Sequence, residues 1–192
     1  MLVLVRHGEA TANAQGLLLG RSDVPLTDKG RLQAAALRAH LGPVVRLVSS
    51  PLRRAVDTAR ALGAGAPVLD DRWIELDYGE HEGAAVLDAP ELWQHWRADP
   101  SYRPPGGESL DDVGARVRAA CEELFSSNGA GARDDAGDVV VVSHVSPIKA
   151  AVAWALGAGA DAAWRMHLST GSITRIGWGS HEPVLHAYNV VP

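Results

Sequence analysis

Residues 1–13 read MLVLVRHGEATAN, and this stretch sets the architecture expected for the rest of the chain. Leu2–Val5 is an aliphatic run without polar alternation, which is typical of a strand buried on both faces. The run ends at Arg6 and His7, whose guanidinium and imidazole groups can bind or attack an anion. We therefore expect a central strand that carries reactive side chains at its carboxyl end.

The same arrangement of an aliphatic run followed by polar side chains occurs twice more. Val44–Val48 precedes the segment Ser49–Arg54, and Val139–Val142 precedes His144. In an open α/β sheet the ligand crevice lies at the carboxyl ends of the strands, so the three loops can converge there and form an anion pocket. Two Ser-Pro pairs predict helices that begin in these loops, with the serine as N-cap: Ser50-Pro51 and Ser146-Pro147.

Helices and strands are expected to alternate along the rest of the chain. Thr27 is typical of a helix N-cap, and Ser109 with Asp112 forms a capping-box pattern. The pattern predicts an α/β fold, a three-layer α/β/α sandwich around a mostly parallel mixed sheet, in one domain over residues 1–192. The expected helices lie at 28–41, 52–62, 89–96 and 110–125, the further strands at 67–69, 172–178 and 184–190, and a mobile linker at 126–138.

The composition excludes several classes of protein. With 46% hydrophobic and 21% charged residues, the chain of 192 residues matches the globular average, which excludes intrinsic disorder. A net charge of −5 disfavours nucleic acid as a partner, so a bound phosphate would need a local basic pocket. No apolar run is long enough for a membrane span, and Arg6 ends the first run too early for a signal peptide. With the lone Cys121, these features predict a cytoplasmic protein without a membrane partner or metal site, and the apolar end 190–192 is compatible with a homodimer.

Six short motifs in order resemble those of the histidine phosphatase superfamily, which includes the cofactor-dependent phosphoglycerate mutases and many small-molecule phosphatases. The resemblance implies a phosphoglycerate mutase-like fold, in agreement with the sandwich expected from the pattern of helices and strands. The motifs are Arg6-His7-Gly8-Glu9 with Asn13, Pro25-Leu26-Thr27 with Gly30, Ser49-Ser50 with Leu52, Arg54 and Thr58, Glu75 with Gly79 and Glu82-Gly83, Gly106-Gly107-Glu108-Ser109, and Val142-Ser143-His144.

The chemistry expected of these residues is transfer of a phosphoryl group. His7 offers a neutral imidazole nitrogen, a nucleophile that needs no deprotonation near neutral pH. The resemblance implies a phosphohistidine intermediate at His7. It also implies that Glu75 is the general acid for the leaving alkoxide and afterwards the base that activates water. No metal ion and no cofactor are expected.

The remaining catalytic and binding residues follow from the same resemblance. Arg6, Arg54 and a protonated His144 are expected to bind the oxygens of the transferring phosphoryl group. Asn13 is expected to contact a phosphate oxygen, and backbone N–H groups near Gly20 are expected to extend the pocket.

Two features of this sequence bear on those assignments. Arg53 and Arg54 are adjacent and point to different faces of a helix, so at most one of them contacts phosphate, and the motif register selects Arg54. Val145 follows His144 where the family usually has glycine, which puts local backbone contacts to phosphate in doubt.

Three functions are open to this site. The first is hydrolysis of a small phosphorylated substrate, and the second is a phosphoglycerate mutase reaction, which would need a 2,3-bisphosphoglycerate primer. The third is a catalytically silent phosphate-binding module, which would not need Glu75. The segment 84–108 favours hydrolysis, because the mutases carry a longer insertion there with paired arginines, and Arg97 is single unless Arg103 compensates. The residues expected at the substrate rim are Trp73, Trp93, Trp96, Arg97 and Arg103.

Overall fold

The computed structural model describes residues 1–127, 137–178 and 182–192. The linker predicted at 126–138 therefore falls largely outside the described residues. Every other helix and strand expected from the sequence lies within them.

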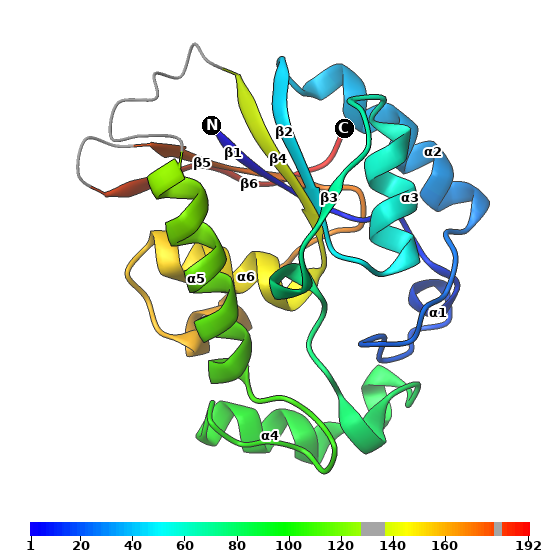
Figure 1. Cartoon of the computed structure of the whole chain (residues 1–192). Coiled ribbons are helices and arrows are strands. Elements are labelled where there is room, and N and C mark those ends of the chain that lie inside the picture. The colour runs from blue at the N-terminus through cyan, green and yellow to red at the C-terminus, as the bar shows by residue number, and fades with distance from the viewer. Residues whose placement is uncertain (128–136, 179–181) are drawn as a thin grey trace.

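A mixed six-stranded sheet with the order β3-β2-β4-β1-β5-β6 forms the middle of the molecule (Figure 1). β1 to β4 run parallel, while β5 and β6 are antiparallel additions, which agrees with the predicted mostly parallel mixed sheet. In the register, Arg6 pairs with Ser143 and Ser49 pairs with Val142, so three strands end at one edge. The strands are β1 (Leu2–Arg6), β2 (Val44–Ser49), β3 (Val68–Leu69), β4 (Asp138–Ser143), β5 (Ile173–Trp178) and β6 (Pro183–Val190).

The helices begin and end close to the predicted positions. The Thr27 hydroxyl accepts the N–H of Gly30, and Ser109 and Asp112 form both hydrogen bonds of the predicted capping box. No helix among the described residues is long and apolar enough to cross a bilayer. The α-helices are α1 (Thr11–Ala14), α2 (Asp28–Leu37), α3 (Arg53–Ala61), α4 (Pro90–Ala98), α5 (Leu110–Ser127) and α6 (Val145–Ala155), and a 3-10 helix, η6, covers Ala160–Arg165.

The two Ser-Pro pairs do not cap their helices as predicted. α3 begins at Arg53 after Leu52, and the Ser50 hydroxyl accepts the N–H of Leu52 at 3.3 Å and lies 2.7 Å from a ring nitrogen of His144. α6 begins at Val145, ahead of Ser146, with His144 at the N-cap position. Neither serine is therefore the N-cap of the helix that follows it.

Helices cover both faces of the sheet, which confirms the three-layer sandwich. Side chains alternate along β1, so that Val3 and Val5 pack toward the core with Leu37 of α2, and Leu2 and Leu4 belong to the opposite core. Figure 1 shows α2 and α3 on one side of the sheet, α5 and α6 on the other, and α4 beyond the end where the parallel strands finish. α4 therefore lies over the edge at which the predicted reactive side chains meet.

Candidate active site

His7 lies directly after β1 and lines a cavity of about 470 Å³, called the phosphate cavity below. The ring Nδ1 is 2.7 Å from the carbonyl oxygen of Gly8, and since a carbonyl only accepts, Nδ1 carries the proton. Nε2 of the neutral ring is then left with a free lone pair. Burial, with the positive charges of Arg54 and Arg6, holds the pKa of His7 well below its ordinary value. The ring is therefore a neutral nucleophile at the pH of a cell.

His144 lies beside His7 at the end of β4, with the two ring centroids 5.0 Å apart in an edge-on arrangement. The Nε–H of Arg54 donates to Nδ1 of His144 at 3.2 Å, so Nε2 carries the ring proton and donates to the Ser50 hydroxyl. Burial and the neighbouring Arg54 charge hold the pKa of His144 well below its ordinary value. In this arrangement the imidazole is neutral, and its protonation when a phosphoryl group is bound stays a prediction.

Arg54 is the fully buried member of the Arg53–Arg54 pair and does not line the phosphate cavity, so its predicted contact with phosphate stays a prediction. Besides the histidine ring, its guanidinium donates to the carbonyl oxygens of Gly20 and Ser22, each at 2.7 Å. Burial lowers the pKa of Arg54 to about 10, so the group is still charged at neutral pH. Arg53, in contrast, is exposed and lies 3.4 Å from the carboxylate of Asp57.

Arg6 supplies a cation at the wall of the phosphate cavity itself. One terminal nitrogen donates to the carbonyl oxygen of Leu168 at 2.6 Å, while the buried Nε–H has no partner among the described residues. A buried donor without a partner costs free energy unless something binds there. The Nε–H of Arg6 is therefore suited to an anion inside the cavity.

Glu75 faces His7 across the phosphate cavity and is 4% exposed. Its carboxylate accepts three backbone N–H groups, from Leu76 at 2.8 Å, Val145 at 3.0 Å and Ser146 at 3.1 Å. These donors stabilise the negative charge of the carboxylate. The backbone after His144, which was in doubt because of Val145, thus holds Glu75 at the first turn of α6.

The predicted binding residues divide into one that lines the phosphate cavity and three that do not. Asn13 lines the cavity, with its side-chain oxygen accepting the N–H of Ala10 at 3.0 Å. The N–H of Gly20 itself donates to the carboxylate of Glu82 at 3.0 Å, while the neighbouring Leu19 lines the cavity, so a contact from backbone near Gly20 stays a prediction.

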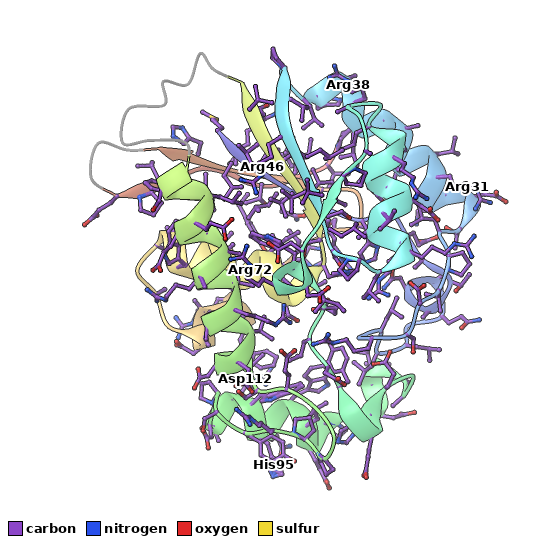
Figure 2. The ribbon with its side chains drawn as sticks, viewed as in Figure 1. Arg31, Arg38, Arg46, Arg72, His95 and Asp112 are labelled. Carbon is purple, nitrogen blue, oxygen red and sulfur yellow. The ribbon has the colours of Figure 1, made fainter. Side chains whose placement is uncertain are left out.

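The two arginines predicted at the substrate rim lie in other surroundings. Arg97 packs over the ring of Trp164, with its guanidinium carbon 5.3 Å from the ring centre, and lines a second cavity of about 720 Å³. Arg103 donates to the carboxylate of Asp112 at 2.6 Å and lines neither of the two cavities. Figure 2 shows Asp112 at the start of α5, beside α4. Arg97 and Arg103 therefore do not form a pair at the phosphate cavity.

The sequence analysis missed the role of Glu82, although the residue stands in one of the quoted motifs. Its carboxylate accepts the N–H groups of Gly20, Arg21 and Ser22 at 3.0, 3.3 and 3.1 Å, while Arg54 binds two carbonyl oxygens of the same turn. Hydrogen bonds to the buried Arg54 guanidinium and to the Glu82 carboxylate thus hold the turn 20–22 in place. The feature of the sequence that could have indicated this role is the spacing between Glu75 and Glu82 in their shared motif.

Trp73 was predicted at the substrate rim, and this prediction is wrong. The side chain is fully buried, and the residue lines neither cavity. Its carbonyl oxygen accepts the Ser143 hydroxyl at 2.6 Å, which ties residue 73 to the end of β4. Trp93 and Trp96, in contrast, do line the cavity of about 720 Å³.

Comparison with known proteins gives one consistent set of relatives. The profile described as histidine phosphatase superfamily (branch 1) matches residues 2–191. A glucosyl-3-phosphoglycerate phosphatase of Mycolicibacterium vanbaalenii is 39% identical over 173 residues, which are 83% of this chain and 76% of that protein. A 2,3-bisphosphoglycerate-dependent phosphoglycerate mutase of Rhizobium etli is 41% identical over 131 residues, 60% of this chain and 63% of that protein.

A solved structure agrees with these sequence matches. A mycobacterial glucosyl-3-phosphoglycerate phosphatase in complex with VO3 superposes with a TM-score of 0.86 and 33% identity, covering 98% of each chain. The first curated relatives that the chain matches, from Mycobacterium bovis and Mycobacterium tuberculosis, are longer, and the chain spans 49% of their length.

Proposed function

Because this chain belongs to the histidine phosphatase superfamily, we propose that it hydrolyses small phosphomonoesters through a phosphohistidine intermediate and without a metal ion. The observation that carries the proposal is the neutral ring of His7, which presents an unprotonated Nε2 in a cavity that it shares with Arg6 and Glu75. The chain is acidic overall, with a net charge of −5, so the affinity for phosphate must come from local groups such as the Arg6 guanidinium.

In the first half-reaction, Nε2 of His7 attacks phosphorus, the N–P bond forms and the P–O bond to the alcohol breaks. The Nδ1–H of His7 stays bonded to the Gly8 carbonyl, which stabilises the positive charge that develops on the ring. Glu75, protonated when the dianion binds, gives its proton to the leaving alkoxide, and the alcohol departs.

In the second half-reaction, water attacks the phosphoryl group on His7 and Glu75 takes a proton from that water. The N–P bond breaks, inorganic phosphate leaves, and the neutral ring of His7 is restored. The three backbone N–H donors fix the Glu75 carboxylate in place at the wall of the phosphate cavity.

The charged groups in the site favour transfer of a phosphoryl group from a dianionic phosphomonoester. Arg6 offers its buried, unpartnered Nε–H at the cavity wall, and Arg54 fixes the His144 ring from behind. Cationic donors that are held in place before the reaction stabilise the charge of a transferring phosphoryl group without reorganising. His144 lies edge-on beside His7, and the negative charge of a phosphoryl group bound at His7 would favour protonation of the His144 ring.

A phosphoglycerate mutase is the second candidate, because a relative described as such a mutase is 41% identical over 131 residues. That reaction needs a second anion site for the bisphosphorylated primer. Arg6 is the one lysine or arginine among the described residues that line the phosphate cavity, and Arg103 is paired with Asp112 elsewhere. This arrangement favours water over a second substrate hydroxyl as the acceptor.

A screen of phosphorylated metabolites tests the proposal by measuring both released phosphate and the interconversion of 3- and 2-phosphoglycerate with added 2,3-bisphosphoglycerate. We expect phosphate release without interconversion. Interconversion that outpaces phosphate release would make the protein a mutase. Neither reaction with any compound, including an activated aryl phosphate, would support the silent binding module instead.

A further inference from the structure

A cavity of about 720 Å³, called the aromatic cavity below, lies next to the phosphate cavity. Four residues line both cavities: Tyr78, Val86, Trp93 and Val145. A phosphoryl group at His7 would therefore direct the alcohol part of its ester toward the aromatic cavity. The volume falls within the range of about 300–1,000 Å³ that is typical of sites for small organic ligands.

Aromatic side chains from three separate elements meet around this cavity. Trp93 of α4 is the centre of the group, with ring centroids 5.9 Å from Trp96, 6.0 Å from Trp164 of η6 and 6.5 Å from Tyr78. The interplanar angle of 75° between Trp93 and Trp164 leaves ring faces and edges that a further planar group can contact. The buried Nε1–H of Trp164 has no hydrogen-bond partner among the described residues.

Many of the other lining groups are apolar, and the charged ones among them are Arg97, Asp111, Arg118 and Lys149. Lys149 donates to the carbonyl oxygen of Ala163 at 3.0 Å, and burial lowers the pKa of this lysine. Arg97 packs over Trp164, and Arg118 lies 4.0 Å from the carboxylate of Glu122 on the same helix. Leucine, valine and alanine side chains supply much of the remaining wall, among them Leu76, Leu110, Val113 and Ala150.

This lining discriminates between kinds of alcohol. A sugar would bring several hydroxyl groups into the cavity, and each hydroxyl buried without a partner weakens binding. A planar apolar ring would bring no such groups, would bury its surface against Trp93 and Trp164, and would gain edge-to-face contacts.

We propose that the aromatic cavity selects phosphomonoesters whose alcohol carries a planar apolar ring, with Trp164 and Trp93 as the residues that bind the ring. This inference rests on the proposed phosphatase function. It differs from the substrate named in the description of the mycobacterial relatives, whose alcohol part includes a glucosyl group.

Three esters of primary alcohols test the proposal, since they share the reacting bond and differ in the group at the far end. They are ethyl phosphate, 2-(glucosyloxy)ethyl phosphate and 2-(2-naphthyl)ethyl phosphate. We expect kcat/KM for the naphthyl ester to exceed that for ethyl phosphate by about 30-fold or more, the size of discrimination that one apolar group gives in a pocket. Equal values for these two esters, or the highest value for the glucosyl ester, would overturn the proposal. Hydrolysis of none of the three would instead count against the proposed function.

The variant Trp164→Leu tests whether the aromatic cavity causes the preference for the naphthyl ester over the ethyl ester. The ratio of kcat/KM for naphthyl to ethyl ester should fall about tenfold, because the ring loses one aromatic wall. His95→Leu is the control, since His95 is exposed on α4, lines neither cavity and points outward at the lower edge of Figure 2. A ratio that is unchanged in Trp164→Leu, or that falls equally in His95→Leu, would contradict the assignment.

A binding measurement keeps the proposal testable if Trp164→Leu does not fold. Calorimetric titration of the unaltered protein with 2-(2-naphthyl)ethanol, the product alcohol, should show saturable binding with a negative heat-capacity change, whereas 2-(glucosyloxy)ethanol should not bind in the same concentration range. The reverse order of the two alcohols would overturn the proposal.

Discussion

The two cavities of this protein differ in how their side chains are held. Around the phosphate cavity the polar groups lie at the ends of β1 and β4 and on α3, and hydrogen bonds fix them, as in the contact of Arg54 with His144. Around the aromatic cavity the side chains come from α4, α6 and η6 and are placed mainly by ring packing. The reaction and the choice of alcohol are thus assigned to different parts of the chain, so substitutions in the two regions should change different quantities.

The largest expected effect is the loss of activity when Glu75 can no longer donate a proton to the leaving group. In Glu75→Gln, kcat/KM for ethyl phosphate should fall by about 10³-fold, since an alkoxide is a poor leaving group without a general acid. For p-nitrophenyl phosphate, whose leaving group needs no proton, the loss should be within about tenfold. kcat/KM is the parameter to compare, because it reports the first half-reaction. An equal loss of kcat/KM for both esters would show that Glu75 is not the general acid.

An equal loss of kcat/KM for all esters is expected when the hydrogen bonds of Arg54 are removed. Arg54→Lys cannot bind His144, Gly20 and Ser22 together, so kcat/KM should fall about 10²-fold for every ester. The ratio between naphthyl and ethyl esters should stay the same. The neighbouring variant Arg53→Lys, at an exposed position, should retain activity. A change of the ester ratio in Arg54→Lys would show that the two regions are coupled.

The buried histidines also predict how stability depends on pH. His7 and His144 have lowered pKa values in the folded protein, so below about pH 6.5 the unfolded chain takes up protons that the folded chain does not. The free energy of unfolding should therefore decrease as the pH falls from 7 to 5.5, by about 1 kcal/mol per pH unit for each buried histidine.

Urea unfolding at the two pH values measures this dependence. His144→Asn should show a shallower decrease, because one of the two groups is gone, whereas replacement of the exposed His95 by asparagine should leave the dependence unaltered. A free energy of unfolding that is constant over this pH range would show that the two rings titrate normally.

The smallest expected effect is that of a chelator, which should leave turnover unchanged. Arg6 at the wall of the phosphate cavity, and Arg54 through its contact with His144, are proposed to supply the positive charge that a metal ion supplies in other phosphoryl-transfer enzymes. Activity is to be measured after dialysis against EDTA and again after adding Mg²⁺, Mn²⁺ or Zn²⁺. Activity that disappears on dialysis and returns with one of these ions would refute the metal-independent mechanism.

The strand-end residues near the phosphate cavity could be predicted from sequence because a local pattern precedes each of them. Aliphatic runs without polar alternation identify buried parallel strands, and the residues directly after them must meet at one edge, as His7 and His144 do. Glu75 could be identified only through the spacing of a family motif, since the residues next to it in the sequence do not distinguish it from other acidic residues.

Several of the differences from the predictions involve hydrogen bonds to residues distant in the sequence. Ser50 was expected to cap a helix, but its hydroxyl also bonds to His144. Backbone near Gly20 was expected to extend the pocket, but the N–H of Gly20 itself donates to Glu82. Arg103 was placed at the substrate by its proximity in sequence, yet Asp112 binds it. Sequence spacing gave no information on which of these partners would prevail.

The aromatic cavity could not be foreseen for a different reason. Tyr78, Trp93 and Trp164 lie in three separate segments, and no period or motif connects them. Their meeting depends on how α4 and η6 pack beside the start of α6, which is a property of the folded chain. The proposed reaction therefore depends on residues at strand ends, and the proposed choice of alcohol depends on tertiary packing.

The most direct test of the account is to look for the covalent intermediate. Glu75→Gln is mixed with p-nitrophenyl phosphate and quenched in base within one turnover, and tandem mass spectrometry then locates the phosphoryl group. The account predicts a phosphoryl group on the His7 ring, formed as fast as nitrophenol is released, and neither adduct nor turnover in a folded His7→Ala variant. An unmodified His7 during sustained turnover, or a His7→Ala variant that keeps its activity, would contradict it.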